Sequence, residues 1–311
     1  MEIRQQILQM FSGRLRKALE ETEVNYEKLR EIRLRVGQPV ILLEEGERFV
    51  SESGKMICPE LKEIRQIVDN ACGYSGYAFE EEIKRGYITV LGGHRIGLVG
   101  KAVMNGNAIQ TLKYMTALNV RIAHPVQGCA EKWKDYFYKN ETPCHVLIIS
   151  PPGCGKTTLL RDAVRMYSEG SAKYPAVTVG VVDERSEIAG TYRGKVSYDL
   201  GIRTDVLDGC PKSLGMEMLL RSMAPQVLAV DEIGTFDVNA LENALRCGCK
   251  ILATLHGEDM NDFLEKPGFE TLTKGKVFER YIFLEREAKP GAVGKIYDKN
   301  LQKLWEGKTC I

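Results

Sequence analysis

The sequence predicts an α/β fold with a mainly parallel sheet in the C-terminal half, preceded by a smaller α+β domain. From Pro143 onward, short apolar runs alternate with helical patterns, which is typical of a parallel sheet covered by helices on both faces. A chain of 311 residues is also long enough for two domains with separate cores. We expect a first domain over residues 1–124, a linker over 125–142 and a second domain over 143–311.

The first domain shows helical and strand patterns in turn. Residues 1–28 carry apolar side chains at helical spacing and predict one or two helices. Residues 31–43 alternate in polarity around a Gly-Gln-Pro turn, which indicates a hairpin. A helix is expected around residues 60–84. The strands expected after it cover residues 86–91, 94–103 and 118–123.

The second domain is predicted from a repeating order of strand and helix. A charged helix with aromatic residues is expected at about 130–139, within the linker. The strands expected after it cover residues 145–150, 176–183, 226–231, 250–255 and 278–284. Because the carboxyl ends of parallel strands meet at one edge of the sheet, residues that follow these strands should gather there.

Residues 145–158 contain the most informative motif of the chain. An apolar strand, a turn rich in Pro and Gly, and a helix that opens at Lys156 form the context of a phosphate-binding P-loop. Lys156 would reach the β- and γ-phosphates of ATP, and the Thr157 hydroxyl would bind Mg²⁺. The candidate nucleotide-binding residues are Ser150, Pro151, Pro152, Gly153, Cys154, Gly155, Lys156, Thr157 and Thr158. Ser150 stands where the motif usually has its first glycine.

A second apolar strand ends in two acidic residues, Asp231 and Glu232. ATP hydrolysis needs a carboxylate for the metal shell and a group that orients the attacking water. Asp231 is therefore the candidate Mg²⁺ ligand, and Glu232 is the candidate for positioning water. The alternative is a helix N-cap with a solvated neighbour, and the independent P-loop upstream favours catalysis.

Two further strand ends place polar residues near the same edge. Asp183 and Glu184 follow one strand, where Glu184 is either a second group for activating water or a salt-bridge partner of Arg185. Another strand places Thr254 and His256 where a γ-phosphate could be sensed.

Residues 201–221 show a different pattern. Their first half is polar and rich in turn residues, and Ser213 could cap the helix that follows. The segment could be a moving element, a subunit contact or an ordered surface loop. Arginines in both domains could neutralise charge on a transferred phosphoryl group, and spacing alone does not select among them.

Composition restricts the class of protein. A net charge of +1 provides no overall electrostatic field that would attract nucleic acid or an anionic membrane. Local patches of positive charge are still compatible with this value. Nine cysteines without a repeated Cys-x-x-Cys spacing indicate reduced cytosolic thiols rather than zinc ligands.

No segment predicts insertion into a membrane. The charged N-terminus does not resemble a signal peptide, and no window approaches the roughly 18 apolar residues of a membrane span. We therefore expect any role at a membrane to depend on a partner protein.

Several motifs occur together over nearly the whole chain. They are residues 150–162, 182–189, 201–208, 210–212 and 223–234, with 31–37 and 119–123 in the first domain. Together these motifs resemble the family of stage III sporulation protein AA of endospore-forming bacteria. That family in turn is similar to the ATPases of type II and type IV secretion systems, which have a small N-terminal domain and a RecA-like ATPase domain and form hexameric rings.

The resemblance implies roles for individual residues. Lys156 and Thr157 would belong to the Walker A motif, and Asp231 and Glu232 to Walker B. Asp183 and Glu184 would form the acidic box, and His256 the histidine box. Arg203 and Arg221 match positions where such ATPases carry functional arginines. The candidate catalytic residues are thus Glu232, Glu184, His256, Arg221 and Arg203.

The resemblance also implies a biological setting. The chain would act as a homo-hexameric ATPase with ATP and Mg²⁺, energising a channel complex between mother cell and forespore. It would work from the mother-cell cytoplasm, peripheral to the membrane through channel proteins of the same operon. Two alternatives stay open: a RecA- or AAA-type ATPase acting on nucleic acid, which the neutral net charge disfavours, and a nucleotide-dependent switch with little turnover.

Overall fold

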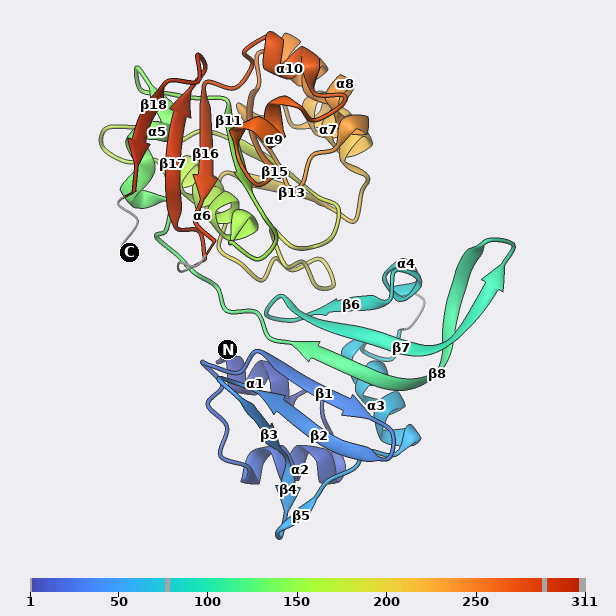
Figure 1. Ribbon diagram of the computed structural model, residues 1–311. Coiled ribbons are helices and arrows are strands. Elements are labelled where there is room, and N and C mark those ends of the chain that lie inside the picture. Colours follow the sequence, from blue (N-terminus) through green and yellow to red (C-terminus); the bar gives the residue numbers. More distant parts are fainter. Residues whose placement is uncertain (1, 76–78, 287–289, 308–311) are drawn as a thin grey trace. The chain divides into compact units, whose positions relative to one another are not determined.

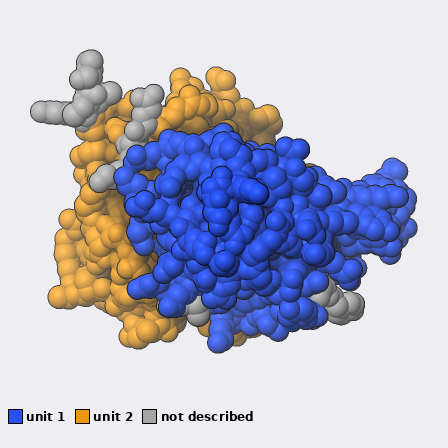
Figure 2. All heavy atoms as spheres, turned by 90° about the horizontal axis from the view of Figure 1, so that it is seen from below, with its two compact units in different colours: residues 1–124, 190–197 blue, residues 125–189, 198–311 orange. Residues whose placement is uncertain are grey.

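The computed structural model describes residues 2–75, 79–286 and 290–307. It divides the chain into two compact units, which are coloured separately in Figure 2. Unit 1 contains residues 1–124 and 190–197, and unit 2 contains residues 125–189 and 198–311. We call residues 190–197 the strap, because the chain leaves unit 2 to form this short part of unit 1 and then returns.

Unit 1 is built around an antiparallel sheet with the strand order β3-β2-β1-β8-β7-β6 (Figure 1). Its strands are β1 (Glu31–Arg35), β2 (Gln38–Leu43), β3 (Glu47–Phe49), β6 (Tyr87–Val90), β7 (His94–Asn105) and β8 (Ala108–Arg121). The remaining elements are α1 (Ile3–Leu8), α2 (Gly13–Glu21), α3 (Leu61–Ala71), α4 (Glu80–Lys84) and the small hairpin β4 (Ser51–Glu52) and β5 (Lys55–Met56).

The core of unit 1 follows from alternation along the strands. Ile32 and Leu34 on β1 are fully buried, as is Ile96 on β7, whereas the residues between them are partly exposed. The predicted hairpin at 31–43 is present as β1 and β2. The prediction of one helix over 60–84 was wrong, because α3 ends at Ala71 and α4 begins at Glu80; residues 76–78 of that range lie outside the described residues.

The strap is fixed inside unit 1 by specific contacts. The Tyr192 hydroxyl donates a 2.7 Å hydrogen bond to the carbonyl oxygen of Ala71, and its ring centroid lies 5.9 Å from that of Phe79. The hydroxyl of Ser197 accepts a 3.2 Å hydrogen bond from the backbone N–H of Gly92. The strap is therefore a packed part of this unit rather than a surface loop of unit 2.

Unit 2 contains an eight-stranded sheet with the order β13-β12-β14-β15-β11-β16-β17-β18. Its strands are β11 (Val146–Ser150), β12 (Val179–Asp183), β13 (Thr204–Asp208), β14 (Val227–Val230), β15 (Lys250–His256), β16 (Arg280–Leu284), β17 (Val293–Asp298) and β18 (Lys303–Glu306). The strands from β13 to β16 are parallel, and β17 and β18 continue the sheet in antiparallel fashion. The expected α/β fold with a mainly parallel sheet is thus confirmed.

Helices cover both faces of this sheet (Figure 1). On one face, α6 (Lys156–Glu169) packs through Leu160 into a core that includes Val146 and Val179. On the other face, α7 (Lys212–Ser222) and α8 (Val238–Arg246) contribute Met216 and Leu241 to a second core. The short helices η3 (Thr235–Asp237), α9 (Met260–Leu264) and α10 (Glu270–Lys274) complete the unit.

Two segments of unit 2 differ from the expectation. Residues 204–208 form β13 at the edge of the sheet, although we expected only a turn-rich loop there; a half-buried edge strand shows a weak apolar pattern because one side faces solvent. The helix that follows begins at Lys212 without a side-chain cap, so the prediction that Ser213 caps it was wrong.

The expected linker also packs as part of unit 2. It forms η2 (Glu131–Trp133), α5 (Lys134–Phe137) and the strand pair β9 (Tyr138–Lys139) and β10 (Thr142–Pro143), and buries Phe137 in the core. Within the described residues, none of the helices is both long and apolar enough to cross a bilayer.

Candidate nucleotide-binding site

The phosphate-binding loop connects the carboxyl end of β11 to the first turn of α6. Gly155 has a φ of +92°, and a Cβ atom there would lie 2.3 Å from the backbone nitrogen of Gly291, so glycine is required on both counts. Ser150, by contrast, ends β11 in extended backbone and donates a 2.9 Å hydrogen bond to the carbonyl of Pro151. The loop therefore forms with serine at a position where glycine is usual.

Lys156 is buried inside this loop. Its Nζ donates hydrogen bonds of 3.0 Å to the carbonyl oxygen of Ser150 and 3.1 Å to that of Pro151. A buried ammonium with only neutral carbonyl partners is poorly compensated, and anionic phosphate oxygens form stronger, charge-assisted hydrogen bonds. The lysine is thus placed to exchange backbone carbonyls for phosphate.

The Thr157 hydroxyl links the loop to the end of β14. It donates a 2.5 Å hydrogen bond to Oδ2 of Asp231, while the Thr254 hydroxyl at β15 donates to Oδ1 of the same carboxylate. Burial raises the pKa of Asp231, and the hydrogen bonds from Thr157 and Thr254 oppose that rise. Three segments that are distant in sequence therefore converge on one buried carboxylate.

This donor set fits Mg²⁺. A hydroxyl and a carboxylate are the hard oxygen ligands that Mg²⁺ prefers, and in nucleotide sites the ion usually takes few protein ligands and completes its shell with phosphate and water. Among the described residues, no group of three or more His, Cys, Asp or Glu side chains could hold a metal. The residues present thus suit a metal that arrives with a nucleotide better than one held by protein alone.

Glu232 follows Asp231 and adopts an uncommon backbone conformation. Its φ is +49°, and its N–H donates a 2.8 Å hydrogen bond to the Thr254 hydroxyl. The side chain leaves the strand end and accepts a 3.1 Å hydrogen bond from Nη1 of Arg185. Left-handed backbone at a non-glycine residue is often found where a side chain must be aimed precisely.

Asp183 holds the backbone that leads toward the strap. Its carboxylate accepts hydrogen bonds from the N–H groups of Glu187, Ile188 and Ala189 at 2.8, 3.0 and 2.8 Å. Burial raises the pKa of Asp183 to about 6, while these backbone hydrogen bonds act in the opposite direction. In this arrangement, Asp183 organises a loop.

Arg161 was not singled out from the sequence. Its guanidinium donates to the carbonyl oxygens of Ile188 and Glu187 at 2.7 and 2.6 Å and stacks 3.8 Å from the ring centroid of Tyr198. It thereby ties the P-loop helix to the same loop that Asp183 organises. The available signal was a charged residue in the second turn of an amphipathic helix, which alone does not distinguish a buried cation from a solvated one.

Glu184 forms an ion pair of 2.7 Å with Lys212 at the start of α7. A small pocket at the ends of β12 and β14 is walled by Asp183, Glu184, Asp231 and Glu232, together with Lys212 and other neighbours. The two candidate acids for activating water therefore face one pocket from adjacent strands.

The remaining candidates lie in different places. His256 ends β15 beside the P-loop, with Ser150 as its register partner, and its side chain is exposed. Arg203 precedes β13, at the end of the sheet opposite the P-loop, where it donates to the carbonyl oxygen of Ser168. Arg221 lies in the last turn of α7 and is 82% exposed. The structure does not bring either arginine into the site of its own chain.

Comparisons with known proteins identify the family and the fold of the chain. The family described as sporulation stage III, protein AA matches residues 1–304. Stage III sporulation protein AA of Bacillus subtilis is 39% identical over 311 residues, covering 98% of this chain and 99% of that protein. Protein SEEDLING PLASTID DEVELOPMENT 1 of Arabidopsis thaliana is 28% identical over 57% of this chain, and that match covers only 25% of the plant protein.

Solved structures share the fold. The ATPase DotB of Legionella pneumophila aligns with 86% of this chain and 75% of its own at a TM-score of 0.55 and 16% identity. The ATPase DotB of Yersinia pseudotuberculosis aligns with 93% of this chain and 80% of its own at a TM-score of 0.57 and 11% identity. These identities support a common fold and no more. The near-complete family match and the similarity to the Bacillus protein show that the chain belongs to the family of sporulation stage III protein AA.

Proposed function

We propose that unit 2 binds ATP with Mg²⁺ and hydrolyses it, as the motor of a sporulation complex of the secretion-ATPase type. The observation that carries the proposal is the 2.5 Å hydrogen bond between Thr157 and Asp231, which brings the P-loop and the acidic end of β14 to one point. The P-loop alone would bind phosphate, and the acidic end of β14 alone would offer only a metal ligand. ATP hydrolysis requires both at one place.

Each residue has a defined part in this proposal. Lys156 gives up the carbonyls of Ser150 and Pro151 and pairs with the β- and γ-phosphates. Thr157 and Asp231 would hold Mg²⁺, which neutralises charge on the phosphates when bound. Glu232 accepts a hydrogen bond from the attacking water and orients it.

We assign the water-orienting role to Glu232 rather than Glu184. Glu232 directly follows the candidate metal ligand, and its partner Arg185 is 57% exposed, so their ion pair is weak and easily broken. The partner of Glu184 is Lys212, which is only 15% exposed. Glu184 is therefore the more firmly held of the two carboxylates.

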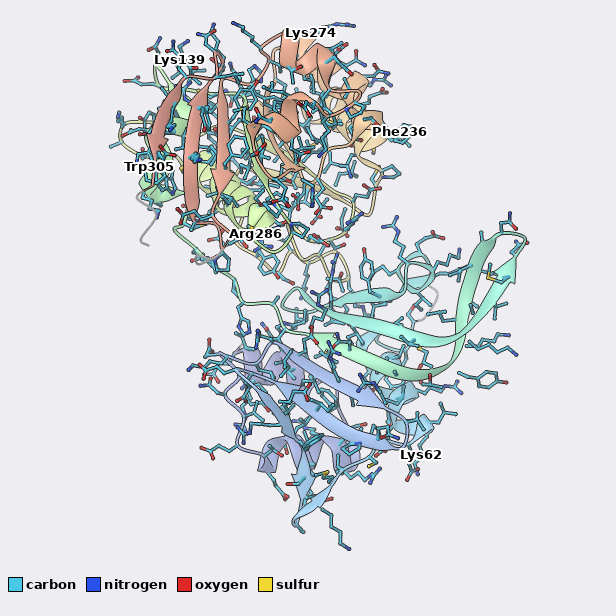
Figure 3. The ribbon with its side chains drawn as sticks, in the orientation of Figure 1. Lys62, Lys139, Phe236, Lys274, Arg286 and Trp305 are labelled. Carbon is cyan, nitrogen blue, oxygen red and sulfur yellow. The ribbon has the colours of Figure 1, made fainter. Side chains whose placement is uncertain are left out.

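Assembly into a ring is the second part of the proposal. Arg203 and Arg221 lie away from the site of their own chain, so any catalytic role requires a neighbouring subunit. Unit 2 also exposes large apolar side chains, among them Leu214, Met218 and Phe236, which is 93% exposed and extends outward from η3 (Figure 3). Exposed apolar side chains of this size often mark protein contacts. The secretion ATPases that this family resembles form hexameric rings, which is a further reason to expect a ring here.

The proposal is tested by steady-state ATP hydrolysis measured against protein concentration, with Lys156→Ala as the blank. We expect a specific rate that rises with concentration and disappears in the variant. A rate that does not depend on concentration would contradict the shared site and leave a complete active site in each subunit. Tight ATP binding without turnover would favour the nucleotide switch. Hydrolysis that increases on adding DNA or RNA would favour an ATPase acting on nucleic acid.

A further inference from the structure

The distal part of the β7–β8 hairpin, residues 99–116, forms a two-stranded ribbon that we call the arm. In unit 1, β6 pairs with β7 only as far as Gly97, and β1 pairs with β8 only as far as Ala117. No other strand among the described residues pairs with the ribbon beyond these points. Figure 1 shows the arm extending away from the rest of unit 1, and the same part is the blue protrusion at the right of Figure 2.

A bulge at the base gives the arm its direction. The register shifts between Val99 and Lys101, and a Cβ atom on Gly100 would lie 2.7 Å from the carbonyl oxygen of Lys113. Opposite Gly100, Tyr114 adopts a φ of +46° and remains 69% exposed. Bulges bend a strand and redirect its side chains, so the arm has a defined shape at its junction with the sheet.

Apolar side chains are exposed along the arm. Near the tip of the arm, Met104 is directly opposite Ile109. Closer to the base, Leu112 lies opposite Ala102, and it is half-buried and packs against the core of unit 1. Met104 and Ile109 are 52% and 42% exposed. Isolated two-stranded ribbons are marginally stable in water, and one that keeps an apolar face exposed gains stability when another surface covers it.

The two charged side chains of the arm, Lys101 and Lys113, are both basic, whereas Lys84 and Arg121 outside the arm form ion pairs with Glu81 and Glu31. Residues 83–130 contain no Asp or Glu, although the chain has 42 of them. The basic residues within this range are Lys84, Arg85, Arg95, Lys101, Lys113 and Arg121. Lys101 and Lys113 lie directly opposite each other across the arm, which is an unfavourable pairing of like charges. Neither lysine forms an ion pair within the part of the chain that the structure describes.

We propose that the arm binds directly to an anionic lipid surface. The face that contains Met104 and Ile109 enters the interface between headgroups and acyl chains. Lys101 and Lys113 reach lipid phosphates through their flexible stems, which relieves the repulsion between them. Tyr114 is suited to the same boundary, where its ring is apolar and its hydroxyl is hydrated.

The shape of the arm favours lipid over a folded partner. A folded protein would need a groove matched to the width and bend of the ribbon, whereas a fluid bilayer closes around side chains on both of its faces. The proposal does not depend on ATP hydrolysis, and it differs from our expectation that a partner provides every contact with a membrane.

The test is flotation of the full chain with vesicles of phosphatidylcholine, with and without phosphatidylglycerol, at low and high salt. Three double variants are compared with the wild type: Lys101→Glu with Lys113→Glu, Met104→Ser with Ile109→Ser, and the control Lys55→Glu with Lys62→Glu. The control residues are exposed on the same unit and undergo the same charge change (Lys62 is labelled in Figure 3).

We expect binding only to phosphatidylglycerol vesicles, weakening as salt increases. The lysine variant should bind at least about tenfold more weakly, and the Met104/Ile109 variant at least about fivefold more weakly. The control should bind within about twofold of the wild type, because its lysines lie outside the arm. Circular dichroism melting curves that match the wild type show that each variant is folded.

Three results would overturn the proposal. Equal binding to both kinds of vesicle would show that negative charge is not recognised. An equal loss in the control would show that binding follows net charge rather than the arm. Absence of vesicle binding, with a smaller oligomer in the arm variants by sedimentation, would show that the arm contacts a second copy of the chain instead.

Discussion

Arg185 at the end of β12 and Glu232 at the end of β14 are joined by a hydrogen bond of 3.1 Å between Nη1 and Oε2. The two strands are neighbours in the parallel sheet, so both side chains lie at the edge where the P-loop also begins. In this ion pair, the Glu232 carboxylate, which we propose orients water, is hydrogen-bonded to the Arg185 guanidinium. Hydrolysis requires that carboxylate to accept a hydrogen bond from water instead.

Replacing Arg185 with Ala should therefore increase basal ATP turnover modestly, by up to about fivefold. Both partners are substantially exposed, at 57% and 43%, and such pairs contribute only about 0.2–1 kcal/mol. Steady-state phosphate release, measured for Arg185→Ala and Arg185→Lys, checks this expectation. A loss of more than about tenfold in both variants would indicate instead that the guanidinium stabilises the transferred phosphoryl group.

Thr157→Ala should abolish Mg²⁺-dependent turnover, whereas Thr157→Ser should retain it. The alanine variant removes both a candidate metal ligand and the donor to the buried Asp231 carboxylate, and we expect a decrease of at least about 100-fold. Serine keeps the hydroxyl and should remain within about fivefold of the wild type. The rate of ATP hydrolysis, measured at increasing Mg²⁺ concentration, distinguishes Thr157→Ala from Thr157→Ser. Equal activity in both variants would exclude the hydroxyl from metal binding.

The strap makes a separate contribution to unit 1. Tyr192→Phe removes the hydrogen bond to Ala71 and should lower the free energy of unfolding by about 1 kcal/mol. Tyr192→Ala also removes the ring beside Phe79 and should cost about 3 kcal/mol or more. Urea denaturation of the full chain provides the measurement, with Tyr114→Phe as the matched control because that side chain is exposed. A similar loss in the control would show that the assay does not report on the strap.

Stability should depend on pH through His94. Burial lowers the pKa of His94 from 6.5 to about 4, and its Nδ1 accepts a 3.0 Å hydrogen bond from the N–H of Ala123. The unfolded chain therefore binds a proton near pH 6.5 that the folded chain binds only near pH 4. The free energy of unfolding should fall as the pH decreases across this range, by about 2 kcal/mol at pH 5.

Denaturant unfolding at pH 7 and pH 5 checks the effect of His94. His94→Gln should reduce the difference between the two pH values by about 2 kcal/mol. His145, whose pKa burial also lowers to about 4, contributes in the same direction as His94. Asp183, whose pKa burial raises to about 6, contributes in the opposite direction. An unchanged difference in His94→Gln would show that this residue titrates alike in the folded and unfolded chain.

Much of the site was predictable because its parts follow buried parallel strands. Lys156, Thr157, Asp231 and His256 each stand at or just after a strand end, and parallel topology alone brings such residues to one edge. The apolar runs of β11 and β14 are fully buried, and the sequence pattern of such strands is strong.

Other features depend on tertiary contacts that short sequence patterns do not encode. The edge strand β13 is half-buried and carries polar residues, so it resembled a loop. The assignment of the strap to unit 1 depends on the contact between Tyr192 and Ala71, residues that are far apart in the chain. Arg161 is buried because Tyr198 and the carbonyls of Glu187 and Ile188 surround its guanidinium. Helical periodicity gives no sign of that environment.

The central claim is that Glu232 acts on water at a site that already binds ATP. The most direct measurement compares ATP affinity and turnover in Glu232→Gln, with Glu184→Gln as the matched control. We predict that Glu232→Gln binds ATP within about threefold of the wild type and loses at least about 100-fold in turnover, while Glu184→Gln loses less. Turnover that survives in Glu232→Gln and disappears in Glu184→Gln would contradict the account. It would show that Glu184, which follows β12, is the residue that orients the attacking water.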